Sequence, residues 1–144
     1  MSDWNAEKMY ELGTRHARLE AERKLDELMD TLVPDPVYEY HPLGLRMSGG
    51  DRVRRYYAQF IDDFMQKVQG FVLLSEWSNA QSVCQEYDIT LLVDGQFETH
   101  RTVGILYADP AGSGLLGGER IYGSERLVRL MAGPIFDELE HLED

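Results

Sequence analysis

Two long segments joined by Asp94-Gly95 constrain the fold of this chain more than any other feature. In residues 82–93 the pattern alternates: Val83, Tyr87, Ile89, Leu91 and Val93 fall on one face, and Cys84, Glu86, Asp88 and Thr90 fall on the other. Residues 96–108 form a second strand candidate. Asp-Gly between two strand candidates is a strong signal for a two-residue hairpin turn, because that turn needs positive φ at its centre. The sequence therefore predicts two long antiparallel strands.

A two-residue turn also fixes which residues of the two strands face each other. It predicts the pairs Leu92 with Phe97, Ile89 with His100, and Asp88 with Arg101. A slip by one residue would move every side chain to the other face of the sheet, so this register is a sharp expectation.

The remaining segments predict an α+β fold. Apolar spacing predicts helices over 5–32 and 52–69, with strands at 37–40, 71–77 and 115–122, and Ser124 as the cap of a last short helix. Pro34 and Pro36 are expected to end the first helix, because proline lacks the backbone N–H. Helices followed by a run of antiparallel strands are typical of a sheet with helices on one face, and a bent sheet of this kind leaves a cavity at its open end.

The length of 144 residues fits one domain. Gly13 is expected to interrupt the first helix, which would make residues 1–13 an N-terminal extension outside the main core. Pro134 is expected to start a C-terminal tail, so that residues 132–144 lie outside the compact part.

Charge and composition narrow the possible partners. The net charge of -12 disfavours nucleic acids and anionic membranes, which bind clusters of Lys and Arg. The single cysteine, Cys84, rules out an internal disulfide, and the four histidines are too scattered to predict a metal site. The first residues do not resemble a signal peptide, and no apolar run reaches bilayer length. We expect a cytoplasmic protein without a cofactor or metal.

Four segments resemble the NTF2-like superfamily, specifically its SnoaL-like branch. They are residues 37–44 (VYEYHPLG), 50–57 (GDRVRRYY), 86–90 (EYDIT) and 118–124 (GERIYGS). The last is similar to a Gly-Glu-Arg-x-Tyr-x-Asp pattern that ends the final strand in many members. Order and spacing carry the resemblance, which extends from about Thr14 to about Met131. This chain departs from the pattern at Ser124, where an acid is expected.

The resemblance implies a cone in which a strongly bent antiparallel sheet wraps around N-terminal helices and encloses a hydrophobic pocket. It implies a small apolar molecule as ligand and a homodimer through the sheet. It does not imply one activity, because the superfamily includes steroid isomerases, polyketide cyclases, epoxide hydrolases, dehydratases and non-enzymatic modules.

Three residues are candidate proton carriers. Glu119 and Glu86 lie in strands within apolar sequence, and a carboxyl group away from water has a raised pKa that suits it to acid–base work near neutral pH. His41 is a candidate general base because histidine titrates near working pH. The simpler alternative for each is a solvated, salt-bridged or merely hydrogen-bonded side chain.

Five residues are candidates for substrate binding: Tyr38, Tyr57, Trp77, His100 and Tyr122. Buried Tyr and Trp need a partner for their polar atom, so a cavity that they line can orient a ligand. Asp88 and Arg101 could instead poise a water molecule for epoxide opening, but an ion pair across the hairpin is the simpler interpretation.

Three functions stay open from the sequence. The first is a cofactor-independent isomerase, cyclase or dehydratase that acts on a small apolar molecule. The second is a non-catalytic module that binds a ligand or a protein, which the loss of the acid at Ser124 favours. The third is a structural dimer whose pocket is filled by its own aromatic side chains, such as Trp77 and Phe97.

Overall fold

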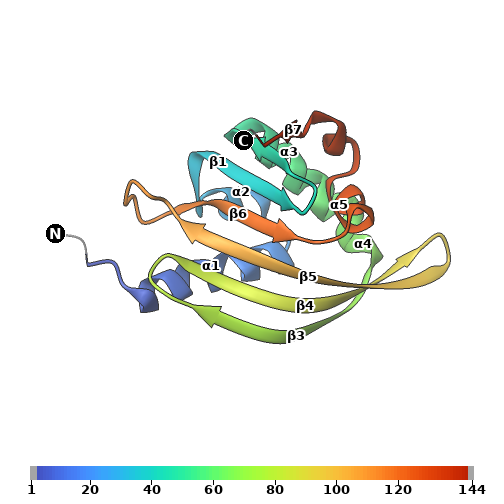
Figure 1. Ribbon diagram of the computed structural model, residues 1–144, viewed down its shortest axis with the longest axis horizontal. Coiled ribbons are helices and arrows are strands. Elements are labelled where there is room, and N and C mark those ends of the chain that lie inside the picture. Colours follow the sequence, from blue (N-terminus) through green and yellow to red (C-terminus); the bar gives the residue numbers. More distant parts are fainter. Residues whose placement is uncertain (1–2, 143–144) are drawn as a thin grey trace.

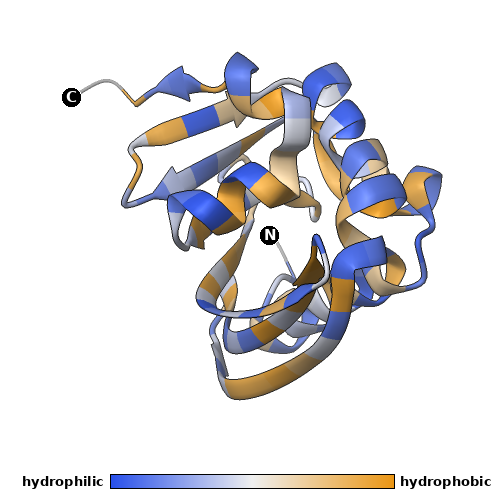
Figure 2. Cartoon of the chain, turned by 90° about the vertical axis from the view of Figure 1, so that its right-hand side faces the viewer, coloured by the Kyte–Doolittle hydropathy of each residue, from blue (hydrophilic) through white to orange (hydrophobic). Residues whose placement is uncertain are grey.

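The computed structural model describes residues 3–142 and has helices on one side of a strongly curved sheet (Figure 1). The helices are α1 (Ala6–Ala21), α2 (Leu25–Met29), α3 (Gly50–Gln59), α4 (Met65–Lys67) and α5 (Glu125–Ala132). Seen from the side in Figure 2, the sheet curls so that helices lie within its curve. This arrangement is the predicted α+β cone.

The strands of the described residues form one seven-stranded sheet in the order β3-β4-β5-β6-β1-β2-β7. Their bounds are β1 (Leu32–His41), β2 (Leu45–Ser48), β3 (Val68–Ser78), β4 (Ser82–Val93), β5 (Gln96–Ala108), β6 (Leu116–Tyr122) and β7 (Glu140–His141). The sheet is mixed rather than purely antiparallel, because β1 and β6 run parallel. The short strands β2 and β7 were not predicted.

The hairpin of β4 and β5 confirms the predicted register. Leu92 pairs with Phe97, Ile89 with His100, and Asp88 with Arg101. Asp94 and Gly95 both have positive φ, as the two-residue turn requires. The turn chemistry therefore sets which face of each long strand is turned inward.

Helix α1 runs through Gly13 without a break, contrary to the expected interruption. Gly13 is buried against β4, where a Cβ would come within 2.7 Å of the Val83 side chain, so this position needs the smallest residue. The helix ends at Ala21, well before the two prolines. Pro34 and Pro36 lie inside β1, between ladder pairs where the register shifts and a missing N–H is tolerated.

Described residues of both terminal segments pack against the core. Met9 and Leu12, within the expected N-terminal extension, are buried. In the expected C-terminal tail, a 3-10 helix spans Gly133–Glu138 and buries Ile135, and β7 follows it. The buried core therefore includes residues from 1–13 and from 132–144.

After Gln59, helix α3 continues as a π-helical turn over Phe60–Phe64 and then as α4. Turns of this kind are frequent at functional sites, because the extra residue re-aims side chains. Here the rings of Tyr57, Phe60 and Phe64 follow one another at centroid distances of 6.0 and 4.9 Å. They form an aromatic wall that faces the sheet. None of the described helices is long and apolar enough to cross a bilayer.

Candidate functional site

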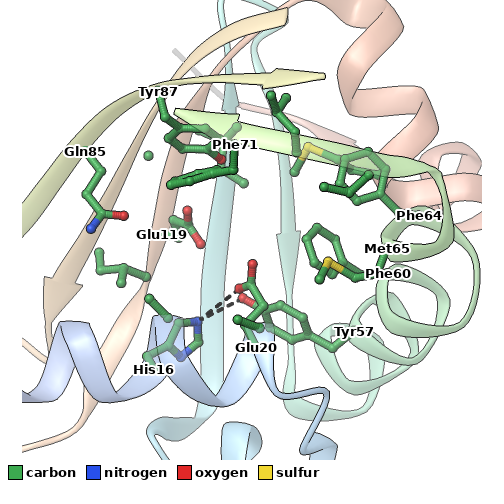
Figure 3. Close-up of a pocket in the computed structure, with 18 of the residues that line it drawn as sticks. His16, Glu20, Tyr57, Phe60, Phe64, Met65, Phe71, Gln85, Tyr87 and Glu119 are labelled. Atoms are coloured by element: carbon green, nitrogen blue, oxygen red, sulfur yellow. Dashed lines mark hydrogen bonds and ion pairs between the residues drawn. The ribbon is translucent and has the colours of Figure 1, made fainter. Parts of the chain in front are cut away.

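A cavity of about 400 Å³ lies between the concave face of the sheet and the helices (Figure 3). Its lining is mainly apolar and comes from α1, α3, the π-helical turn, β3, β4, β5, β6 and α5. The volume is within the range of small-molecule sites. Trp77 and Phe97 are not among the residues that line the cavity.

Glu119 projects into this cavity from the middle of β6. Ile121 is two residues further along the strand and also lines the cavity, so both side chains lie on the inward face of β6. On the neighbouring strand β5, Gly104 leaves room for the carboxyl group: a Cβ there would lie 2.8 Å from Glu119 Oε1. The absence of a side chain at Gly104 thus helps to place the Glu119 carboxyl.

Gly104→Ala is expected to displace the Glu119 carboxyl away from β5 and towards α1, which carries a second carboxyl, Glu20. Closer like charges raise a carboxyl pKa, so the titration midpoint of Glu119 should move upward, which carboxyl NMR would measure. Gly70→Ala is a matched control, because open space surrounds a Cβ at that strand position. An unchanged or lower midpoint in Gly104→Ala would contradict the proposed spacing role.

Glu20, near the end of α1, supplies that second carboxyl to the cavity. Figure 3 shows Glu20 and Glu119 both pointing into the space between helix and sheet. The Glu20 side chain is 28% exposed, and Glu20 is among the residues that line the cavity. The described residues give neither carboxyl a hydrogen-bond partner, so both are open to a ligand.

Enclosure raises the pKa of both carboxyl groups. For Glu119 the main cause is burial, followed by repulsion from Glu20, and the pKa rises to about 8. Burial raises the pKa of Glu20 to about 7. The two groups interact, so their protons belong to the pair rather than to either residue. Near neutral pH the pair therefore passes through a state in which it holds a single proton.

His16 lies one helical turn before Glu20 and is completely enclosed. Burial lowers its pKa to about 3, so the imidazole is neutral. Its Nδ1 lies 2.7 Å from Thr31 Oγ1. The Thr31 hydroxyl donates its only hydrogen to the Leu28 carbonyl, at 2.7 Å. Thr31 must therefore accept from His16, which puts the histidine proton on Nδ1.

This tautomer sets the direction of the rest of the chain of hydrogen bonds. His16 Nε2 can only accept, so the Tyr57 hydroxyl donates to it across 3.1 Å. The Tyr38 hydroxyl then donates to the Tyr57 oxygen across 2.5 Å. The Tyr57 hydrogen is thus committed to the protein. His16 Nε2 lies 3.8 Å from Glu20 Oε2, and a neutral imidazole forms no ion pair there.

Of the predicted site residues, Glu119 and Tyr57 line the cavity. Tyr38 is buried directly behind Tyr57 and does not reach the open space. The predicted role of Tyr57 in orienting a substrate is limited to its ring and its oxygen lone pairs, because its hydrogen is used by His16.

The other predicted residues lie away from the cavity. Glu86 lies on the outer face of the sheet, because the next residue, Tyr87, faces inward. Tyr122 lies on the outer face for the same reason, since Ile121 before it faces inward, and His41 pairs with Tyr122. The same holds for Trp77, opposite Cys84. Strand alternation therefore removes Glu86, His41, Trp77 and Tyr122 from the pocket.

The predicted polar pairs on these strands also lie outside the cavity. His41 bonds Glu39 at 2.9 Å and stacks on Tyr122. His100 bonds Glu98, also at 2.9 Å, and lies near Ser124, which caps α5. Asp88 and Arg101 form a two-point ion pair at 3.0 and 3.1 Å. This is the cross-strand pair of the simpler interpretation, with no access to the cavity for epoxide chemistry.

Sequence reasoning missed Glu20 and His16. A signal existed, since Met9, Leu12, His16 and Glu20 recur at helical spacing along the inner side of α1. Among the described residues, no group of three or more His, Cys, Asp or Glu side chains could hold a metal ion.

Comparison with known proteins identifies the fold. No family model and no curated protein sequence matches the chain. An NTF2-like protein from Anabaena variabilis matches at a TM-score of 0.66 and 16% identity, over 87% of this chain and 95% of that one. A steroid delta-isomerase from Pseudomonas aeruginosa matches at 0.65 and 14%, over 91% and 90%.

A third similar structure is SalBIII, an epoxide hydrolase/cyclase-like enzyme in pyran ring formation in the polyether salinomycin. It matches at a TM-score of 0.66 and 14% identity, over 83% of this chain and 93% of that one. At such identities the likeness concerns the fold, and the fold is the NTF2-like cone that the four sequence segments resemble.

Proposed function

We propose that this chain, which has the NTF2-like fold, is a cofactor-independent acid–base catalyst that acts on a small, mainly apolar molecule. One observation carries the proposal: Glu20 and Glu119 face a common apolar cavity without a protein partner, and burial raises the pKa of both towards neutrality. Groups with such pKa values take up and release protons efficiently at physiological pH.

The pair can move a proton within a bound ketone. In its singly protonated state, the ionised carboxylate removes a proton from the carbon next to the carbonyl group, and the electron pair moves onto the carbonyl oxygen. The protonated carboxyl donates its proton to that oxygen, which gives an enol. In a β,γ-unsaturated ketone the first carboxyl then delivers its proton to the γ-carbon, while the enol returns its O–H proton to the second carboxylate and the carbonyl re-forms. This gives the conjugated ketone and restores the pair.

The walls of the cavity support this chemistry. Tyr57, Phe60 and Phe64 present apolar ring surface to the ligand, and a mainly apolar lining stabilises the ionised carboxylate less than bulk water does. Because Tyr57 donates to His16, it cannot also donate to a developing oxyanion. Among the lining groups, the carboxyl pair has the pKa values nearest to neutrality, so we assign the proton donation to it. The isomerase and cyclase-like enzymes among the similar structures support the choice of reaction class.

Unconjugated ketones test the proposal, because isomerisation into conjugation is visible as ultraviolet absorbance. We expect turnover of at least one member of a panel of steroid and monocyclic β,γ-unsaturated ketones. Glu119→Gln and Glu20→Gln should each lower it by about 10²–10⁴-fold, the usual contribution of a positioned acid or base. Glu86→Gln is the control, since Glu86 lies on the same sheet but on its outer face.

Ketones that bind without turnover would contradict catalysis and favour the non-catalytic binding module. So would turnover that survives in both cavity variants. The homodimer through the sheet stays a prediction; Trp77 and Tyr122, exposed at 51% and 43% on the outer face, are among the apolar residues that it would cover.

A further inference from the structure

We propose that the molecule bound in this cavity is an amine, with its cation between Glu20 and Glu119 and its apolar body against the aromatic wall. The inference rests on the proposed function only in using the same carboxyl pair, and it adds the chemical class of the ligand. Three independent features of the cavity lead to it.

The first feature is a charge imbalance in the lining. The lining contains two carboxyl groups and neither Lys nor Arg, and its histidine, His16, is neutral. With one proton on the pair, the cavity carries one negative charge that no described lining residue balances. A buried charge without a partner is costly, whereas a paired one is not. An ammonium group would bring the total charge of the site to zero.

The second feature is open acceptor capacity. An ionised carboxylate can accept several hydrogen bonds, and the described residues supply none to Glu20 or Glu119. An ammonium group carries only donors, so it complements these oxygens directly. A ketone or ether offers acceptors alone and can use only the shared proton.

The third feature is the ring surface next to the carboxyl groups. Tyr56, Tyr57, Phe60, Phe64, Phe71 and Tyr87 all line the cavity. The negatively charged faces of aromatic rings attract cations, and this attraction is strongest where water is excluded. Phe71 also stacks on Tyr87 at a centroid distance of 4.7 Å, which continues the wall onto β3 and β4. The net charge of -12 favours the approach of a cation from solution.

Binding of an amine would couple to the protons of the pair. The other titratable groups that face the pair are His16 from α1, Tyr56 and Tyr57 from α3, Tyr87 from β4, and Tyr38 and Tyr40 from β1. Burial raises the pKa of each of these tyrosines and lowers that of His16, so all stay neutral near pH 7. Only the carboxyl pair changes charge there.

The test compares amines with alcohols of the same shape by titration calorimetry. Suitable pairs are phenylbutylamine with phenylbutanol, cyclohexylpropylamine with cyclohexylpropanol, and the adamantyl amine with its alcohol. We expect the amine of at least one pair to bind about tenfold or more tightly than its alcohol at about pH 8. The preference should shrink at about pH 6, where binding an ammonium must release a proton from the pair.

The double variant Glu20→Gln/Glu119→Gln should reduce the amine to the affinity of the alcohol, because either carboxylate alone can pair with the cation, while Glu86→Gln leaves the preference unchanged. An alcohol that binds as tightly as its amine at about pH 8 overturns the amine class, as does binding by no amine of the three pairs. Turnover of unconjugated ketones in that case would leave the proposed reaction standing. Amine binding without any ketone turnover would support the amine as ligand and contradict the proposed reaction.

Discussion

At about pH 9, Glu119→Gln is expected to raise the free energy of unfolding by about 4–5 kcal/mol, while at about pH 5 the variant and the natural protein should differ by about 1 kcal/mol or less. The pKa of Glu119 is raised in the folded protein, so folding favours the protonated carboxyl. Its contribution to stability is complete below the pKa of the unfolded chain and is lost as pH rises through the folded pKa of about 8. Glutamine resembles the protonated form at every pH.

Urea unfolding at about pH 5, 7 and 9 measures this difference. Glu86→Gln, on the outer face of β4, should stay within about 0.5 kcal/mol of the natural protein throughout. The pKa of Glu20 should fall in Glu119→Gln, because repulsion between the two carboxyl groups disappears. A stability difference between Glu119→Gln and the natural protein that is no larger at about pH 9 than at about pH 5 would show that Glu119 is solvated, and would remove the basis of the proposed proton transfer.

A side chain that destabilises its own fold at working pH is best explained by function. Natural sequences tend to satisfy local rules except where a site requires otherwise. Glu119 and Glu20 depart from those rules in the same cavity, and Gly104 gives Glu119 the room to do so. Two apolar residues in their place would pack the core better, so the pair is the part of the molecule least explained by folding alone.

Local sequence signals predicted the sheet well, because strand alternation and turn chemistry act over a few residues. Asp94-Gly95 set the register of β4 and β5, and that register turns Glu86 outward. Glu119 could be proposed as a pocket residue because it lies in a strand within apolar sequence, on the same face as Ile121. What alternation alone could not settle was which face of β6 is concave, and this depends on how the whole sheet curls.

The part of the site contributed by α1 depends on tertiary packing. Glu20 stands next to Ala21 and Glu22 in a polar stretch, where a glutamate is ordinarily solvated. It faces the cavity only because α1 stays continuous through Gly13 and crosses the concave face of the sheet. The interruption expected at Gly13 concealed the helical spacing that connects Met9 to Glu20. A glycine inside a helix can mark close packing, and here it packs on Val83.

The direction of the buried hydrogen bonds behind the cavity leads to a second large effect. Thr31→Val is expected to destabilise the protein by about 2–3 kcal/mol, because it leaves the buried Nδ1–H of His16 without an acceptor. Tyr38→Phe should cost about 1 kcal/mol or less, since Tyr38 only donates at the end of the chain and Tyr57 keeps its own bond to His16. Urea unfolding of the two variants at one pH shows which of them loses more stability.

The opposite direction of the chain predicts the opposite order. Suppose that Nε2 of His16 carried the proton and donated to the Tyr57 oxygen. The Tyr57 hydroxyl would then donate to Tyr38, and Tyr38→Phe would leave this buried hydroxyl hydrogen without an acceptor. Nitrogen NMR of His16 separates the two tautomers directly, with a protonated Nδ1 expected. A protonated Nε2, or a larger loss in Tyr38→Phe, would mean that His16 donates towards the cavity.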